Sequence, residues 1–577
     1  MNFIKKFLVK KNVIPLLVVL VFAFLASRTL FKSDYFIMHD DLQMMRQLEM
    51  EKCFKDFQIP CRWVPDMGYG FGFPLFNYYP PLPYLMGELF RVFGFSFAMT
   101  AKLTFALAFL ASGITMYFFA KEFFGQIGGV FASIFYIWAP YHSVDIYVRG
   151  AMNEAWALVW FPLIFLAAYR LIKDKKIFKW IVILALSWAA LLMSHNIMVL
   201  IFTPFFSLWV ILLLIREKKW MRLPQLIISG IIAFCLSAFF LIPVFVEQKY
   251  VQVDTLVSGY YEYWAHFVSV YQLFISRFWG DGPSAFSTND GLSFQIGFAH
   301  WIFPLLSFLA VVYSLLRRKK KFSFKIDVVV FSTLFLFALG WLSAFMAHAR
   351  SSFIWNLFPI LKFVQFPWRF LTLAIFGLSF SVGFIPFFIK KNYKKVGKKV
   401  SIILVAIIVG IVLVLNWNYF KPVRSGPLSD EEKFSGEAWR LQQQAGIYDY
   451  LPLTAKEAPT EQQKSIADVV EGDAKIVSSA EGTNWAKFSI DAKNDVVVRV
   501  NIFQFPTWTA KIDNENVTVY VHEDERWGRM FVNVPAGVHQ VSLKLQNTIA
   551  RNVGNIISLF SWVSLIGILL WRRRLLK

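Results

Sequence analysis

Long apolar runs recur along most of this chain, and they constrain its fold more than any other feature. Several of them exceed about 18 residues, the length that a helix needs to cross a hydrocarbon core about 30 Å thick. Hydrophobic residues make up 57% of the 577 residues and charged residues only 17%, whereas soluble domains carry about 25% charged residues. We therefore expect an all-α polytopic membrane protein, with the lipid bilayer as its first partner.

The positions of the apolar runs predict about twelve membrane spans. They lie near residues 12–30, 98–119, 127–141, 155–172, 177–195, 197–215, 224–244, 298–316, 326–346, 367–389, 399–416 and 554–571. The first eleven spans form a transmembrane domain, 1–416, with long loops at 31–97 and 245–297. A less apolar domain follows at 417–553, and 554–577 is the final helix with a basic tail.

The distribution of basic residues predicts the orientation of the chain. Its net charge of +22 would suggest nucleic acid if the Lys and Arg residues formed a domain of their own. Instead they stand between apolar runs, and 30 of them fall in the segments 1–12, 120–126, 170–179, 216–222, 317–325, 390–399 and 572–577. The short segments 141–154, 195–197 and 347–369 hold only four. Because positive loops stay inside, both termini are expected in the cytoplasm of a multi-pass plasma-membrane protein, without a nucleic-acid partner.

The N-terminal apolar run resembles a signal peptide, because four Lys residues precede it. The residues that follow it, 25–28, read Leu-Ala-Ser-Arg and make a poor cleavage site. We therefore expect an uncleaved membrane anchor.

The stretch 417–553 has the pattern of a soluble domain on the outer, extracytoplasmic side. Ser429 followed by Glu432 has the spacing of a capping box and predicts a helix start. From about Lys475 the pattern changes to short alternating runs such as 496–500 and 538–543, separated by turn residues. This alternation predicts a small β-sandwich that the final span tethers to the membrane.

The three cysteines say little about the fold. Cys53 and Cys61 share the first outer loop, where a disulfide is allowed, and Cys235 falls in an apolar run. No other pair supports a disulfide framework, so a bond between Cys53 and Cys61 stays one of two open states.

Ionisable residues near the hydrocarbon are costly and are functional candidates by default. Those that do not belong to a cytoplasmic end all map to the outer interface: His39, Asp40, Asp41, His142, Asp145, Arg149, Glu154, His195 and Arg369. The pair Asp40-Asp41 follows the first span directly and can act as a general base or hold a divalent cation. Alternatively, Asp40 caps an amphipathic interfacial helix over 42–48.

The remaining candidates each have a structural alternative. Trp63 and Tyr79 lie in a loop rich in Gly, Pro and aromatic residues that can present rings to a sugar, or can form an interfacial aromatic belt. Arg149 and Glu154 can pair and brace the fold, or Arg149 can bind phosphate while Glu154 supplies another carboxylate. His195 can carry a proton, donate to a headgroup or satisfy an interhelical contact. Arg369 can snorkel or bind phosphate.

Well-known catalytic motifs are missing from the sequence. It contains no Walker loop, GxSxG, HExxH or pair of CxxC motifs. ATP-driven transport, serine hydrolysis and structural zinc therefore have no motif support.

Three features of the chain carry a resemblance to a known superfamily: Asp40-Asp41 follow the first span, Trp63-Val64-Pro65 and residues 80–84 lie in the loop, and the C-terminal region has a soluble pattern. In these features the chain resembles the GT-C superfamily of membrane glycosyltransferases. The resemblance implies a polyprenyl-phosphate sugar as donor and sugar transfer outside the membrane. It implies Asp40, Asp41 and Glu154 as catalytic residues or, if a divalent cation is used, as its ligands. His39, Trp63, Tyr79, His142, Arg149, His195 and Arg369 would then bind substrate.

Two further resemblances concern separate parts of the chain. His39-Asp40-Asp41, 69–74, 147–154 and 194–196 are similar to bacterial membrane proteins labelled 6-pyruvoyl-tetrahydropterin synthase-related. The three-His zinc site of such a synthase is missing, so pterin chemistry is not expected. The segments 505–513 and 534–539 resemble YfhO-like membrane proteins, although Thr507 and Asn514 stand where that family usually has Gly.

The sequence thus favours inverting transfer of a lipid-linked sugar to an envelope glycan, lipid or protein acceptor. A transporter or flippase of lipid-linked glycans is the alternative from another class, but it would favour polar spans and internal repeats, and the chain shows neither. A third possibility is a non-catalytic protein that binds envelope polymer.

Overall fold

A computed structural model describes residues 10–284, 290–317, 327–393 and 397–575. Its chain divides into two compact units. The first unit comprises Met1–Asp41, Ala101–Ala233 and Gly259–Pro427, and the second comprises Leu42–Thr100, Phe234–Ser258 and Leu428–Lys577. The predicted cytoplasmic segments 1–12 and 317–325 lie mostly outside the described residues.

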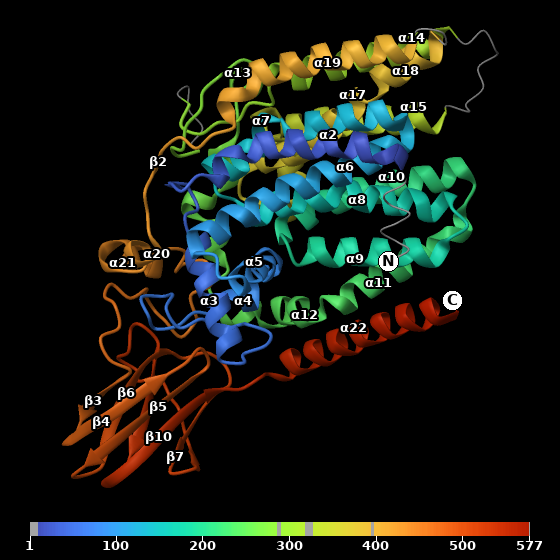
Figure 1. The fold of residues 1–577 in the computed structure, drawn as a ribbon. Helices are drawn as coiled ribbons and strands as arrows, with labels where there is room; N and C mark the ends of the chain where they lie inside the picture. The colour runs from blue at the N-terminus through green and yellow to red at the C-terminus, as the bar shows by residue number, and fades with distance from the viewer. Residues whose placement is uncertain (1–9, 285–289, 318–326, 394–396, 576–577) are drawn as a thin grey trace. The chain divides into compact units, whose positions relative to one another are not determined.

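The first unit is a helical bundle in which long apolar helices run side by side (Figure 1). Its longer helices are α2 (Lys10–Ser27), α6 (Phe97–Ile137), α8 (Met152–Lys173), α9 (Ile177–Leu192), α10 (Asn196–Glu217), α11 (Leu223–Leu236), α14 (Phe298–Leu316), α15 (Val328–Met346), α17 (Leu371–Val382), α18 (Phe384–Asn392) and α19 (Gly397–Asn416). Shorter helices are α7 (Pro140–Ser143), the π-helix η2 (Val144–Val148), α13 (Val270–Phe274), α16 (Ser352–Leu357) and η10 (Pro367–Phe370). One short pair of strands, β1 (Tyr35–Phe36) and β2 (Ser425–Gly426), joins two distant segments of this unit.

Nine helices of the described residues are long and apolar enough to cross a membrane, and the protein is a multi-pass membrane protein. A tenth span results if Trp220–Leu236 and Ala238–Tyr250, which meet at an angle of 78°, are counted together. The predicted spans 98–119 and 127–141 share α6, which is interrupted at Gly125 by a non-helical backbone with φ of 74°. The predicted span 177–195 corresponds to the shorter helix α9. The count of about twelve therefore stays a prediction.

Several boundaries differ from those predicted, because polar residues can extend a helix beyond its apolar run. Helix α8 begins at Met152, so that Glu154 lies in its first turn and not in a loop before it. Helix α22 (Ile549–Leu575) begins five residues before the predicted start of the last span. Within the predicted span 224–244, the helix breaks at Ser237, which is the N-cap of α12 (Ala238–Glu247).

The second unit combines short helices, the helix α22 and the β-strands of the C-terminal region. Its helices besides α12 and α22 are α3 (Gln43–Lys55), α4 (Leu75–Tyr78), α5 (Leu82–Val92), α20 (Asp430–Lys433) and α21 (Gly436–Gln444). The capping box predicted at Ser429 and Glu432 is confirmed, because each side chain bonds the other residue's backbone N–H. Helix α3 has Leu42 as its N-cap residue, not Asp40. Both Met44 and Met45 of α3 are fully buried, so this helix does not have the exposed face predicted for an interfacial segment.

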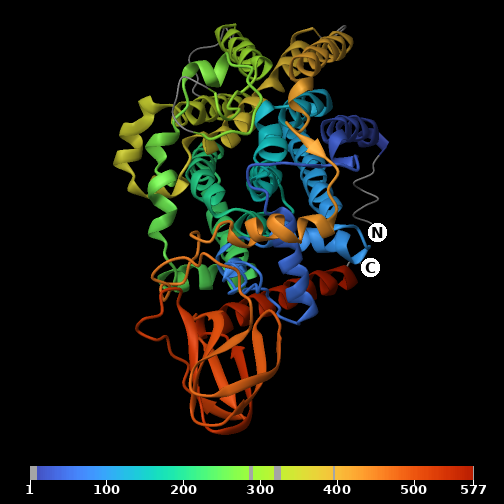
Figure 2. The same ribbon diagram turned by 90° about the vertical axis from the view of Figure 1, so that its left-hand side faces the viewer.

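The C-terminal β-region begins slightly earlier than the predicted residue 475 and contains two antiparallel sheets (Figure 2). Its strands are β3 (Ala467–Glu471), β4 (Ala474–Glu481), β5 (Trp485–Ala492), β6 (Val496–Phe503), β7 (Trp508–Ile512), β8 (Glu515–Val517), β9 (Arg529–Val534) and β10 (Gly537–Leu545). One sheet has the order β4-β5-β10-β7-β8 and the other β3-β6-β9. Alternate residues such as Phe488, Val498 and Val541 are buried in one shared apolar cluster, which is what period-two strands produce.

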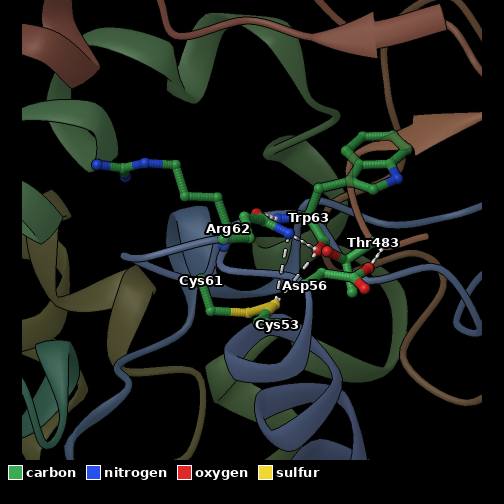
Figure 3. Close-up of a disulfide and its surroundings, with 7 residues drawn as sticks. Cys53, Asp56, Cys61, Arg62, Trp63 and Thr483 are labelled. Atoms are coloured by element: carbon green, nitrogen blue, oxygen red, sulfur yellow. Dashed lines mark hydrogen bonds between the residues drawn. A yellow bond between two sulfur atoms is a disulfide. The ribbon is translucent and has the colours of Figure 1, made fainter.

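A disulfide joins Cys53 and Cys61 in the second unit. Figure 3 shows the bond beneath Trp63, whose carbonyl oxygen accepts a hydrogen bond from Gln58 at 2.9 Å. The Asp56 carboxylate accepts a hydrogen bond from the backbone N–H of Thr483 and so ties this loop to the β-region. Of the two states that the sequence left open, the structure has the disulfide.

Candidate functional site

The candidate site of the first unit is a cluster of charged side chains centred on Arg149. Arg149 Nη1 lies 2.5 Å from Asp145 Oδ1 and 2.8 Å from Glu154 Oε2. Arg369 contacts the same Glu154 oxygen through Nε at 3.8 Å. The two carboxylates are fully buried, and the two arginine side chains are 9% and 12% exposed. Two cations and two anions thus share a space that water hardly reaches, and their charges balance.

Aromatic and amide groups hold the arginines in place. The Arg149 guanidinium lies 4.4 Å above the ring of Trp368, and it donates a hydrogen bond of 3.2 Å to the Tyr141 hydroxyl. Tyr141 in turn donates to Glu154 Oε1 at 3.1 Å. Arg369 Nη1 donates to the Gln365 side chain at 2.7 Å and to the Val364 carbonyl at 2.8 Å. These contacts orient both planar guanidinium groups, which suits them to recognise a carboxylate or phosphate.

The segment that carries Arg149 has an unusual backbone. Residues Val144–Val148 form a π-helical turn, a feature that often marks functional sites, and Asp145 lies on it. Gly150 follows with φ of +66°, and a Cβ atom there would lie 2.3 Å from Met38 Sδ. Only glycine therefore lets the segment around Met38 approach this closely.

That close approach places the backbone of His39 and Asp40 against the backbone of the segment that carries Arg149. The backbone N–H of His39 donates to the Val148 carbonyl at 2.9 Å, and that of Asp40 donates to the Arg149 carbonyl at 2.8 Å. Asp41 accepts a hydrogen bond of 2.8 Å from the Tyr35 hydroxyl. His39 is exposed at its surface, and partial loss of water around the ring, followed by the nearby Arg149 guanidinium, lowers its pKa below the usual range.

His195 faces the same cluster from the start of α10. Its Nδ1 accepts from the backbone N–H of Ile197 at 3.2 Å, which caps the helix and leaves the proton of a neutral ring on Nε2. Burial, followed by the positive charges of Arg369 and Arg149, lowers the pKa of His195 well below its usual range. The sequence left three roles open, and the structure adds a fourth, that of helix cap.

Asp145 is the member of the cluster to which the sequence assigned no catalytic or binding role. Burial, together with the Glu154 carboxylate, raises the pKa of Asp145 well above its usual range. Its position four residues before Arg149 was the available signal, because residues four apart meet on one helical face. Tyr35 and Tyr141 carried no comparable signal, although Tyr35 bonds Asp41 and Tyr141 bonds Arg149 within the same stretches of sequence.

The other predicted residues lie elsewhere in the structure. His142 is fully buried beside Phe109, and burial lowers its pKa to about 4. In the second unit, Trp63 is 2% exposed and packs against Phe505 and Trp508, so the structure gives it a packing role. Tyr79 lies beneath Arg46, whose guanidinium is 4.3 Å from the ring. Substrate contacts of these three residues stay predictions.

The predicted divalent cation has little support in the side chains. Within the described ranges, no group of three or more His, Cys, Asp or Glu side chains could hold a metal ion. Both oxygens of Glu154 already contact Tyr141 or arginine, and this arrangement does not fit a metal ligand.

Comparisons with known proteins give distant similarities. No protein-family model matches the chain. An uncharacterized protein of Lactococcus lactis subsp. cremoris (strain MG1363) is 24% identical over 368 residues, which are 61% of this chain and 54% of that protein. The YfhO-like and pterin-synthase-related resemblances are not confirmed.

Among solved structures, the chain is similar to the Archaeoglobus fulgidus oligosaccharyltransferase, a glycosyltransferase of the GT-C type. The apo form is 11% identical with a TM-score of 0.43, over 78% of this chain and 61% of that one. The form tethered to an acceptor peptide is 12% identical with a TM-score of 0.40, over 71% and 55%. The chain thus spans less than two thirds of these relatives. At such TM-scores the likeness carries no argument about activity, which must rest on the residues themselves.

Proposed function

We propose that this protein is a membrane glycosyltransferase of the GT-C type. It transfers a sugar from a polyprenyl-phosphate donor to an envelope glycan, lipid or protein acceptor on the extracytoplasmic face of the plasma membrane. The observation that carries the proposal is the junction of two features: the buried cluster around Arg149, and the His39-Asp40 segment bonded to its backbone. We infer from this junction that the arginines form a phosphate site and that the acidic pair forms an acid–base site beside it.

The arginines supply the phosphate half of the site. Arg149 and Arg369 stabilise the phosphate that leaves when the sugar is transferred, because a planar guanidinium binds phosphate oxygens through two parallel hydrogen bonds. Both arginines contact the Glu154 carboxylate, which holds their guanidinium groups in place. The His195 Nε2–H provides a further donor for an anionic leaving group.

The acidic pair supplies the other half. Asp40 or Asp41 accepts the proton of the acceptor hydroxyl as that oxygen attacks the anomeric carbon of the sugar. The bond between that carbon and the phosphate oxygen breaks with inversion, and the electron pair leaves with the lipid phosphate. Tyr35 holds Asp41 through its hydroxyl, whereas the segment of Asp40 is held through its backbone. Glu154 orients both arginines in this scheme, which needs no metal ion.

The test is sugar transfer by purified protein in nanodiscs with polyprenyl-phosphate sugars, measured as release of polyprenyl phosphate. We expect Asp40→Asn or Asp41→Asn to lower the rate by at least ~100-fold, the usual contribution of general base catalysis. Asp34→Asn, in the same segment and without an assigned role, serves as the matched control.

Other outcomes would support the alternatives. Native rates in both Asp40→Asn and Asp41→Asn would show that the acidic site is wrong. Movement of a lipid-linked glycan across the bilayer without release of sugar would favour a flippase. Binding of envelope polymer with neither movement nor transfer would favour the non-catalytic protein.

A further inference from the structure

A concave site lies within the second unit, and none of the residues proposed above for sugar transfer lines it. It is a cavity of about 350 Å³, at the lower end of the range of ~300–1,000 Å³ typical of small-molecule sites. Three segments that are far apart in the sequence line it: the loop 65–70, helix α21 with Trp439 and Gln443, and residues 462–481. All three segments belong to the second unit.

Backbone hydrogen bonds hold these segments together around Tyr69. The Tyr69 N–H donates to the Gln443 carbonyl at 3.1 Å, and the Gln463 N–H donates to the Tyr69 carbonyl at 2.8 Å. Gly70, with φ of +88°, follows directly. A Cβ atom at Gly70 would lie 3.2 Å from Gln463 Cβ and 3.5 Å from Gln443 Nε2, so a side chain there would enter the space beside both amides.

Half of the polar side chains of the wall are amides, those of Gln443, Gln462 and Gln463. Gln443 is only 6% exposed, and its Oε1 accepts a hydrogen bond from Gln462 Nε2. Gln463 Nε2 donates to the Asn501 carbonyl at 2.9 Å, which fixes that amide too. Each amide has two donor hydrogens and an acceptor oxygen, a combination that matches hydroxyl groups, because they also donate and accept.

Trp439 adds an aromatic surface to this wall. Its ring packs edge-on against Phe434, with 5.7 Å between ring centroids, and is partly exposed in the cavity. An indole face packs well against an apolar surface whose rim carries polar groups. The C–H face of a sugar ring, surrounded by hydroxyls, has this character.

The charges around the cavity largely cancel. Asp66 pairs with Lys52, and Lys464 pairs with Glu461 at 2.9 Å. Glu49 lies behind Asp66 and is fully buried; burial and the Asp66 carboxylate raise its pKa well above the usual range, which favours the neutral acid. Glu481 is the remaining carboxylate of the rim. A strongly anionic or cationic ligand therefore has little complementary charge here.

We propose that this cavity binds a neutral glycan, with one sugar ring on Trp439 and its hydroxyls on Gln443 and Gln463. The site makes the second unit a carbohydrate-binding module, whether or not the chain transfers sugar. Asp66 and Glu481 accept further hydrogen bonds from hydroxyl groups at the rim.

The test uses full-length protein in nanodiscs without any lipid-linked donor. Probes are chitotriose, mannotriose and maltotriose, with trigalacturonic acid as the anionic comparison, and binding is measured by titration calorimetry and saturation-transfer NMR. We expect at least one neutral trisaccharide to bind and Trp439→Ala to weaken it tenfold or more. Gln443→Ala should do the same, and Glu481→Ala, at an exposed position, should weaken it without affecting folding.

Matched controls come from the exposed face of the same helix. Leu441→Ala and Gln444→Ala should bind as the native chain does. Absence of binding by all three neutral probes, stronger binding of the anionic one, or unchanged affinity in both Trp439→Ala and Glu481→Ala would overturn the proposal. Asp40→Asn should retain full binding, so failure of the transferase proposal would be distinguishable from failure of this one.

Discussion

The guanidinium of Arg149 lies 2.8 Å from the Glu154 carboxylate, in a place where Glu154 is fully buried. Glu154 also faces Arg369, so one carboxylate contacts two arginines. A buried pair of this kind contributes less to stability than its geometry suggests, because both charges lost their water on folding. Removing one partner is costly all the same, since the other charge stays buried and unpaired.

Glu154→Gln should therefore destabilise the protein by about 3–5 kcal/mol, because it leaves two buried cations with one fewer carboxylate. Unfolding of the purified protein, followed by temperature or by denaturant, measures the change. Glu122→Gln is the matched control: Glu122 pairs with Arg170 at a partly exposed position, and such pairs contribute about 0–1 kcal/mol. Equal losses of stability in the two variants would contradict the account of the cluster.

Gly150→Ala tests the close approach that joins the acidic pair to the cluster. The new Cβ would meet Met38 Sδ at 2.3 Å in a backbone with positive φ, a combination of clash and strain that costs about 1–3 kcal/mol. We expect displacement of the segment 38–40 and a loss of transfer activity. Thermal unfolding and the polyprenyl-phosphate release assay measure the two effects.

Gly94→Ala separates the two contributions to that loss. Gly94 also has a positive φ, +80°, but a Cβ atom there would have no neighbour within 4 Å. The variant Gly94→Ala should therefore have the backbone strain of Gly150→Ala but not its clash, and sugar transfer should continue at the native rate. If Gly94→Ala lost as much activity as Gly150→Ala, the contact with Met38 would not explain the effect.

The long apolar runs predicted the helical membrane character, and period-two alternation predicted the β-region, because both are properties of local sequence. The break of α6 at Gly125 falls within the segment 120–126 that the sequence placed between two spans. The sequence did select Arg149, Glu154 and Arg369 as costly charges. That Arg369 joins Arg149 and Glu154 depends on the packing of a distant segment, which no spacing rule predicts.

The raised pKa of the Glu88 carboxyl makes the stability of the folded protein depend on pH. Burial raises its pKa to about 7, with a hydrogen bond from Gln47 acting in the opposite direction. Between the ordinary value of 4.5 and about 7, the folded protein holds a proton that the unfolded chain releases. Stability should therefore fall as pH rises through this window, and Glu88→Gln should flatten the profile. Melting temperatures between pH 4.5 and 8 measure it.

Glu51 provides a comparison of opposite sign in the same pair of helices. Burial opposes the shift, but hydrogen bonds from Arg91 and Lys55 lower the pKa of Glu51. The ionised Glu51 carboxylate therefore stabilises the fold at pH values above its unfolded pKa. This stabilisation is lost as pH falls through the lower pKa of the folded state. Glu51→Gln should therefore destabilise the protein at neutral pH, where Glu88→Gln stabilises it. A change in stability of the same sign in both variants at neutral pH would contradict the opposite pKa shifts of Glu51 and Glu88.

The disulfide between Cys53 and Cys61 provides a test of sidedness. Under non-reducing, denaturing conditions one thiol per chain, that of Cys235, should react with maleimide, and all three should react after reduction. Its closed loop is short, so reduction should lower stability by about 2–3 kcal/mol. In a Cys235→Ser variant, labelling by a membrane-impermeant maleimide in intact cells should require prior treatment with an impermeant reductant. Labelling without reductant only after the membrane is opened would place this loop in the cytoplasm, because cytosolic thiols stay reduced.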